Sequence, residues 1–120
     1  MNESRGVTVM IDSGGGAELG DVRSTGGLLT IVAENNILTG DVRATGGNAE
    51  LTSNTGQIGT GDVTSDDNNV LMTAAGDITT QMVDAGLNAT LNGASINYGS
   101  VAADSNATLT AGGSITGGSV

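Results

Sequence analysis

The sequence predicts an all-β fold, a single-stranded parallel β-helix (β-solenoid) of about six coils with 18–21 residues each. Two observations predict it. The eight residues that begin at Gly20 recur almost unchanged from Gly40, and related segments follow along the rest of the chain. Within each repeat, apolar residues alternate with polar ones, so that alternate side chains share one face of a strand. Repeats of this length bury a continuous core only by stacking on one another.

Four apolar positions recur at fixed places in the repeats, and we expect each position to form a column along the coil axis. Coils would lie about 4.8 Å apart, the spacing of hydrogen-bonded strands. The columns are Val22, Val42, Val63, Val83, Val101 and Val120; Ala17, Ile37, Ile58, Ile78, Ile96 and Ile115; Ile11, Ile31, Leu51, Met72, Leu91 and Leu109; and Val9, Leu29, Ala49, Val70, Ala89 and Ala107.

We expect two or three short strands in each coil. One of them has two column residues separated by one polar residue, as in Leu29-Thr30-Ile31, which is the period of a strand. Five residues always separate the isoleucine column from the valine column, as between Ile37 and Val42. Insertions fall only in stretches rich in Gly, Asn and Asp, which are turn-forming residues.

The chain is long enough for one domain. We assign residues 1–5 to a non-repeat N-terminal leader, without the basic-then-apolar pattern of a signal peptide, and residues 6–120 to the β-helix. Apolar runs are far too short to span a bilayer. Because Val120 already belongs to the valine column and no cap follows it, we expect either continuation in a longer β-helix or end-to-end stacking of copies.

Composition excludes several functions. The 120 residues include no Cys, His, Phe or Trp and a single Tyr, and the formal net charge is −10. The sequence therefore offers no disulfide, no thiolate nucleophile and no histidine base or metal ligand. A chain this acidic repels phosphate, so we expect no nucleic-acid partner and no membrane insertion. The lack of large rings suits a narrow interior, and we expect no enzyme activity, cofactor or metal.

A polar column directly precedes the fourth apolar column. We expect the side-chain amides to donate and accept along the stack as a ladder. Two of these asparagines also match the N-glycosylation pattern, in Asn88-Ala89-Thr90 and Asn106-Ala107-Thr108, and we favour the structural reading. The column consists of Asn48, Asn69, Asn88 and Asn106.

The segments 106–120 and 47–53 resemble the repeats of filamentous-haemagglutinin-type exoproteins, which bacteria export by two-partner secretion. The resemblance covers residues 6–120 and is one of composition and spacing. It implies a right-handed β-helix at the bacterial cell surface or outside the cell, serving as the non-catalytic shaft of an adhesin or contact-dependent toxin. It also suggests host-cell or surface glycans as partners. No secretion or effector domain is recognisable.

Two acidic groups are candidate sites. The column Asp21, Asp41 and Asp62 is either a calcium site, because hard oxygen ligands suit calcium, or a solvated face whose charge Arg23 and Arg43 offset. Thr64 stands in the arginine position of the third repeat.

The second group is Asp66-Asp67-Asn68-Asn69. Paired carboxylates can act on glycosides, so a polysaccharide-binding or polysaccharide-cleaving β-helix is the alternative function. Tandem Asp and Asn are also typical turn residues, and the chain has no long loop to build a cleft.

The sequence suggests two further surfaces. An ice-binding array would need Thr-x-Thr on consecutive coils; Thr108-Leu109-Thr110 fits, but the array is broken by Glu50, Leu71 and Asn92. We also expect Leu19, Met82 and Tyr98 on the outer segment between the isoleucine and valine columns. There they either contact a partner or are scattered surface residues.

Overall fold

The computed structural model describes residues 3–6 and 9–119, and every regular element in them is a β-strand. The strands are β1 Glu3–Gly6, β2 Val9–Ser13, β3 Ala17–Glu18, β4 Asp21–Ser24, β5 Leu29–Ala33, β6 Ile37–Leu38, β7 Val42–Ala44, β8 Ala49–Ser53, β9 Ile58–Gly59, β10 Val63–Ser65, β11 Val70–Ala74, β12 Ile78–Ala85, β13 Ala89–Gly93, β14 Ile96–Ala103, β15 Ala107–Ala111 and β16 Ile115–Ser119.

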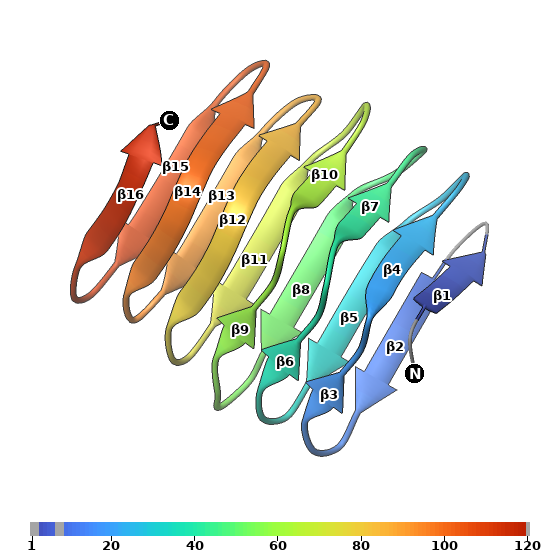
Figure 1. Ribbon diagram of the computed structural model, residues 1–120, viewed down its shortest axis with the longest axis horizontal. Coiled ribbons are helices and arrows are strands. Elements are labelled where there is room, and N and C mark those ends of the chain that lie inside the picture. Colours follow the sequence, from blue (N-terminus) through green and yellow to red (C-terminus); the bar gives the residue numbers. More distant parts are fainter. Residues whose placement is uncertain (1–2, 7–8, 120) are drawn as a thin grey trace.

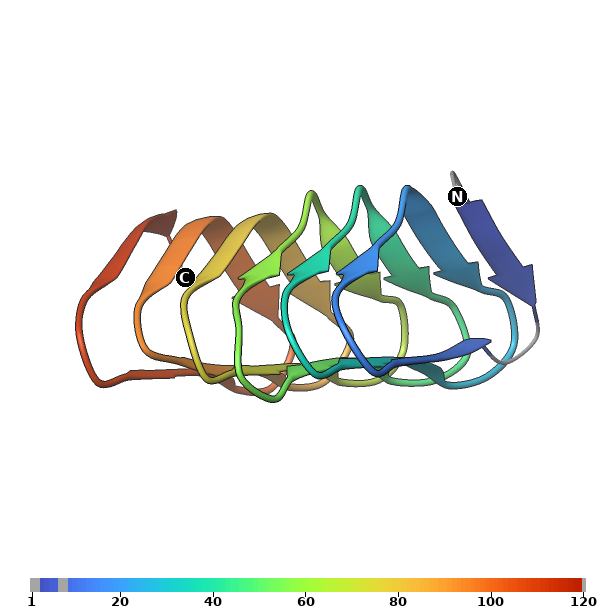
Figure 2. The same ribbon diagram turned by 90° about the horizontal axis from the view of Figure 1, so that it is seen from below.

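The predicted β-solenoid is confirmed. Five complete coils, β3–β5, β6–β8, β9–β11, β12–β13 and β14–β15, lie between the partial coils β1–β2 and β16. Figure 2 shows the successive coils stacked along one axis. In Figure 1 the nearer strands point upward while the chain advances from right to left and returns behind, so the coil is right-handed, as connections between parallel strands generally are.

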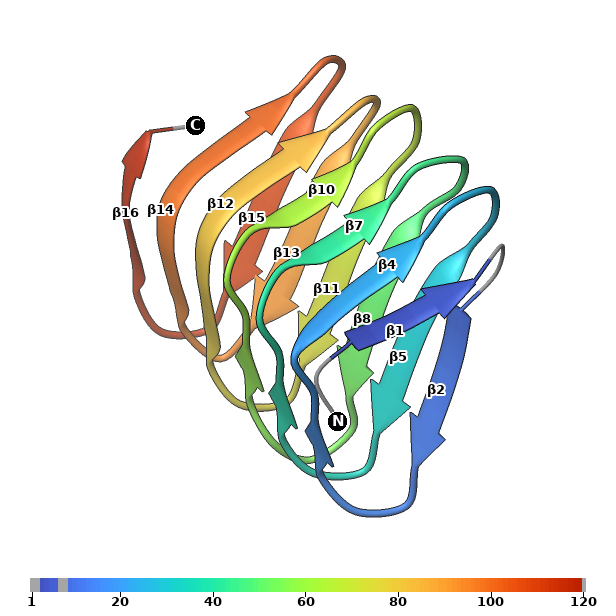
Figure 3. The same ribbon diagram turned by 45° about the vertical axis from the view of Figure 1, so that its right-hand side comes forward.

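All strand pairs of the described residues are parallel, and they form two sheets. One sheet has six strands in the order β15-β13-β11-β8-β5-β2, and the other joins the remaining ten strands. Figure 3 shows the two sheets on either side of the coil interior. Strand β1 begins at Glu3, inside the segment 1–5 that the sequence assigns to a leader, and pairs in register with β4.

The four predicted columns are in register between successive coils. Val42, for example, pairs with Val22 on one side and Val63 on the other, and Ile37 and Ile58 pair in the next column. Residues of the four columns from Val22 to Val101 are buried. Towards the ends the burial decreases: Ile11 is half-buried and Ile115 is 46% exposed. Val120 lies outside the described residues.

Two further inward columns consist of small residues, and the sequence pattern did not reveal them. They follow the predicted columns at the ends of the second and third strands, where the burial pattern continues to alternate. Serine occupies these positions in some coils and alanine in others, so the sequence does not show them as apolar positions. The columns are Ser24, Ala44, Ser65, Ala85 and Ala103, and Ser13, Ala33, Ser53, Ala74, Gly93 and Ala111.

The coil changes its cross-section along the axis. In the earlier coils a corner separates the first two strands, as between β6 and β7, whereas β12 and β14 run without a break through eight residues each. Threonines line this corner: the hydroxyl of the half-buried Thr60 donates to Thr80 Oγ1 (2.8 Å), and the hydroxyl of the buried Thr80 donates to the Gly61 carbonyl (3.1 Å). The molecule measures 34 × 32 × 18 Å, a flattened block at this number of coils.

Candidate functional site

The aspartate column at the corner is a hydrogen-bond ladder. The Asp41 amide donates to Asp21 Oδ1 (2.9 Å), the Asp62 amide to Asp41 Oδ1 (3.0 Å) and the Met82 amide to Asp62 Oδ1 (3.3 Å). The preceding glycines use the backbone carbonyls: Gly40 N donates to Gly20 O (3.1 Å). At the bend, a backbone amide of the next coil has no backbone carbonyl to bind. The aspartate side chain therefore supplies the acceptor for that amide.

The asparagine column lies at a second corner and acts in the same way. Backbone amides of Asn69, Asn88 and Asn106 each donate to the Oδ1 of the asparagine one coil earlier, at 3.0, 3.0 and 3.1 Å. The predicted stack is confirmed, but these hydrogen bonds join a side chain to a backbone amide rather than two side chains. A third corner follows the pattern, because Gln57 N donates to Asn36 Oδ1 (2.9 Å).

The carboxylates do not converge on a site. Among the described residues, no three acidic, histidine or cysteine side chains are placed to hold a metal ion. One oxygen each of Asp21, Asp41 and Asp62 accepts a hydrogen bond from a backbone amide, which gives the column a structural role in the corner.

The segment Asp66–Asn68 forms the turn between β10 and β11. Asp66 is half-buried and Asp67 is exposed. Arg43 Nη2 donates to Asp66 Oδ2 (3.0 Å), with the two side chains 53% and 27% exposed. The partner of Arg43 is thus the turn aspartate, and a pair this exposed contributes little to stability.

Buried serines hold the turns, a role that the sequence analysis missed. The Ser53 hydroxyl donates to Asn35 O (2.5 Å) and accepts from Gly56 N (3.1 Å). Ser65 does the same, donating to Gly47 O (2.8 Å) and accepting from Asn68 N (3.2 Å). The signal in the sequence is a serine directly before a Gly- or Asn-rich turn.

The three residues expected on the outer segment differ in their exposure in the structure. Leu19 and Tyr98 are half-buried and pack against the core, so they are not an exposed pair. Met82 is 50% exposed. The outer face of the six-stranded sheet carries the threonines together with Glu50, Leu71 and Asn92, which interrupt the Thr-x-Thr pattern as the sequence indicates.

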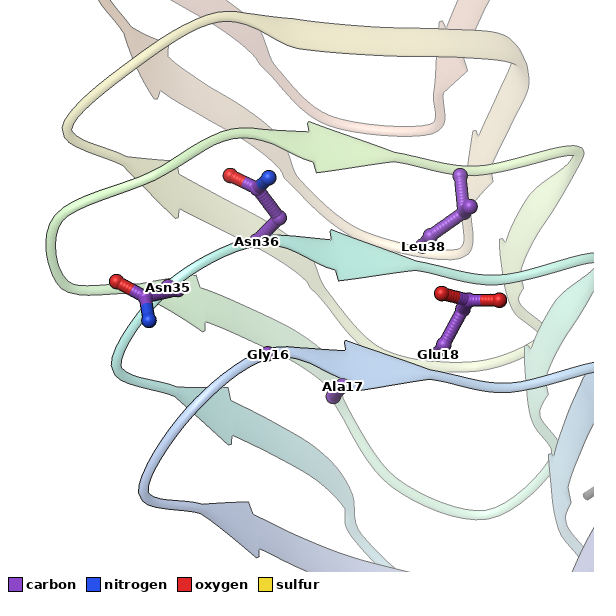
Figure 4. A pocket seen from close by; sticks show the side chains of 6 residues that line it. All are labelled: Gly16, Ala17, Glu18, Asn35, Asn36 and Leu38. Atoms are coloured by element: carbon purple, nitrogen blue, oxygen red, sulfur yellow. The ribbon is translucent and has the colours of Figure 1, made fainter.

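A shallow hollow of about 300 Å³ lies over β3 and β6. A second, of about 150 Å³, continues over β9. Figure 4 shows Glu18 and Leu38 projecting from neighbouring strands, with Asn35 and Asn36 at the corner beside them. Leu38 is 54% exposed and stands between the two hollows. The side chains that line the two hollows present mainly aliphatic, amide and carboxylate groups.

No helix in the described part of the chain is long and apolar enough to cross a membrane. Comparisons with protein families, curated proteins and solved structures found no match.

Proposed function

We propose that this chain is a structural shaft, a non-catalytic β-solenoid segment of a secreted or surface-exposed bacterial adhesin or exoprotein. The observation that carries the proposal is the uninterrupted core: the same buried columns pass through every complete coil, and each coil pairs only with its neighbours. Such a stack can be lengthened one repeat at a time without changing its fold. The resemblance of residues 6–120 to filamentous-haemagglutinin-type repeats supports the surface location.

In this role the end coils bind further β-helix, either more of the same chain or another copy. Ile115 and the half-buried Leu109 are apolar residues that such an extension would cover.

The proposal is tested by surface labelling of the bacterium that produces the chain. An antibody against residues 6–120 is expected to label intact cells or to detect the chain in the culture medium, and electron microscopy of the labelled material is expected to show fibres or stalks. A chain found only inside the cells would refute the surface role. A cytosolic marker protein serves as the control for cell lysis.

A second candidate, glycan binding, is favoured by the hollow at Leu38, where amide and carboxylate groups flank an apolar side chain. A glycan array with the native chain tests it. Leu38→Ala is expected to abolish binding at this hollow, whereas Asp66→Ala and Asp67→Ala test the turn that the sequence analysis singled out. A native chain that binds no glycan would exclude this candidate.

A further inference from the structure

All basic residues of this acidic protein fall in one register column. Arg5, Arg23 and Arg43 are the only basic residues of the sequence, and they pair with one another on successive coils. Along the same column they are followed by Thr64, Asp84 and Ala102.

A parallel column of acidic residues lies two positions earlier in the sequence, on β4 at Asp21 and directly before β7 at Asp41. It contains Asp21 and Asp41, with Glu3 in register with Asp21. On β4 the valine between the two columns is buried, while Asp21 and Arg23 are exposed. The acidic and the basic column therefore flank the valine column on the outer face of the coil, about 6.6 Å apart along β4.

Each column alone is electrostatically unfavourable, because like charges directly opposite one another on neighbouring strands destabilise a sheet. Asp21 and Asp41 each accept a backbone hydrogen bond at Oδ1. The second oxygen of each carboxylate remains for a further donor. Arg43 uses Nη2 for Asp66, and a guanidinium has further N–H groups to donate.

We propose that this face binds the same face of a second copy, side by side and with the two coil axes parallel. A two-fold axis along the outside of the valine column exchanges the acidic and the basic columns. Asp21 then faces Arg23 of the second copy, and Asp41 faces its Arg43, on both sides of the axis. Because both copies have the same coil spacing, the charges stay in register over the coils that carry them, as an isologous interface requires.

The remainder of the face suits the same arrangement. Met82 continues the acidic column after Asp62 and is 50% exposed. Across the two-fold axis it faces Asp84 of the second copy, between the methyl groups of that copy's Thr64 and Ala102. Pairing would cover this apolar side chain, which has no other place in the shaft role.

Sedimentation of the full chain over a range of protein concentrations tests the proposal. At low salt we expect a concentration-dependent dimer whose dissociation constant rises steeply with added NaCl, since exposed charges are screened. The variant R23E/R43E sets acidic columns against each other and is expected to weaken the dimer at least tenfold. R23K/R43K keeps the charges and is expected to retain a dimer.

Net charge is controlled with T52E/T73E/T90E/T108E, which lowers the net charge by the same four units but places the new charges on the outer face of the other sheet. This variant is expected to dimerise like the native chain, and circular dichroism checks that every variant remains folded. X-ray scattering distinguishes the mode of association: side-by-side pairing thickens the 34 × 32 × 18 Å particle, whereas end-to-end stacking lengthens it by whole coils. A native chain that stays monomeric at low salt, or a dimer indifferent to R23E/R43E, would overturn the proposal.

Discussion

The ring of Tyr98 lies against the α-carbon of Gly117, its register partner on the next strand, so that a β-carbon at position 117 would overlap the ring atoms. Tyr98 is the only aromatic residue of the chain, and it is half-buried against the core. In the preceding coil its place in the column is taken by the smaller Thr80. The glycine therefore provides the space that the largest side chain requires.

Substituting Gly117 with alanine is expected to displace this ring. Overpacking of this kind costs about 1–3 kcal/mol of the free energy of unfolding, measured by urea denaturation. Because Tyr98 is the sole fluorophore, acrylamide quenching should also report a more exposed ring. The control is Gly112→Ala, where an added β-carbon meets nothing within 4 Å. Equal stability of the two variants would contradict the arrangement.

At the aspartate corner, the side-chain oxygen rather than the charge is expected to matter. Asp41→Asn keeps an oxygen for the Asp62 amide (3.0 Å) and should change the free energy of unfolding by less than about 0.5 kcal/mol. Asp41→Ala leaves that amide without its acceptor and should cost about 1 kcal/mol. Thermal unfolding of the two variants in the same buffer makes the comparison. An Asn variant as unstable as the Ala variant would show that charge is what the corner needs.

The columns could be predicted because one physical constraint fixes them. A stacked coil places equivalent residues above one another, so a period near 20 with apolar residues at constant offsets reveals which side chains face inward. Val42 and Ile37 follow this rule, and their register was predicted correctly. The aspartate and asparagine columns were also visible, but their bonding was not, because the sequence does not show which backbone amides a bend leaves without a carbonyl.

Ser53 illustrates what the pattern concealed. Its hydroxyl is buried, 2% exposed, between Ala33 and Ala74 of the same column. Serine to alanine at this position preserves the packing and removes two hydrogen bonds to the turn. We expect Ser53→Ala to lower the free energy of unfolding by about 1–3 kcal/mol, the cost of leaving polar groups unsatisfied.

The control for this prediction is Ser105→Ala, at an exposed turn position, which should be nearly neutral in the same urea titration. A Ser53 variant as stable as the native chain would mean that water or another group satisfies the turn.

Close approach of neighbouring coils predicts opposite effects at two turn glycines. A β-carbon on Gly47 would lie 2.6 Å from the Gly27 carbonyl oxygen and 2.8 Å from Leu28 N, whereas one on Gly15 meets nothing within 4 Å. Gly47→Ala must separate two backbone segments and should lower the melting temperature by several degrees. Gly15→Ala reduces the freedom of the unfolded chain and should stabilise by about 0.4–1 kcal/mol. Calorimetry of both variants decides; a stabilised Gly47→Ala would show that the coils can move apart freely.

Two features could not be predicted from the sequence: the packing of Tyr98 in its column, and the merging of the first two strands of a coil into the single strand β12. Leu19 and Tyr98 look like outer residues because they lie between two predicted columns. In the structure they pack against the core from the corner, where the earlier coils bend. Nothing in the sequence period marks where a bend becomes a continuous strand.

The backbone bonds between coils, such as Val22 N to Asp41 O (2.9 Å), run along the stacking direction. Tension applied between the two termini therefore breaks these hydrogen bonds one coil after another, starting from an end of the stack. A released coil of 20 residues adds about 65 Å of extended polypeptide. Under mechanical load, the chain would unfold one coil at a time, and each step would dissipate part of the applied work before the whole chain is extended.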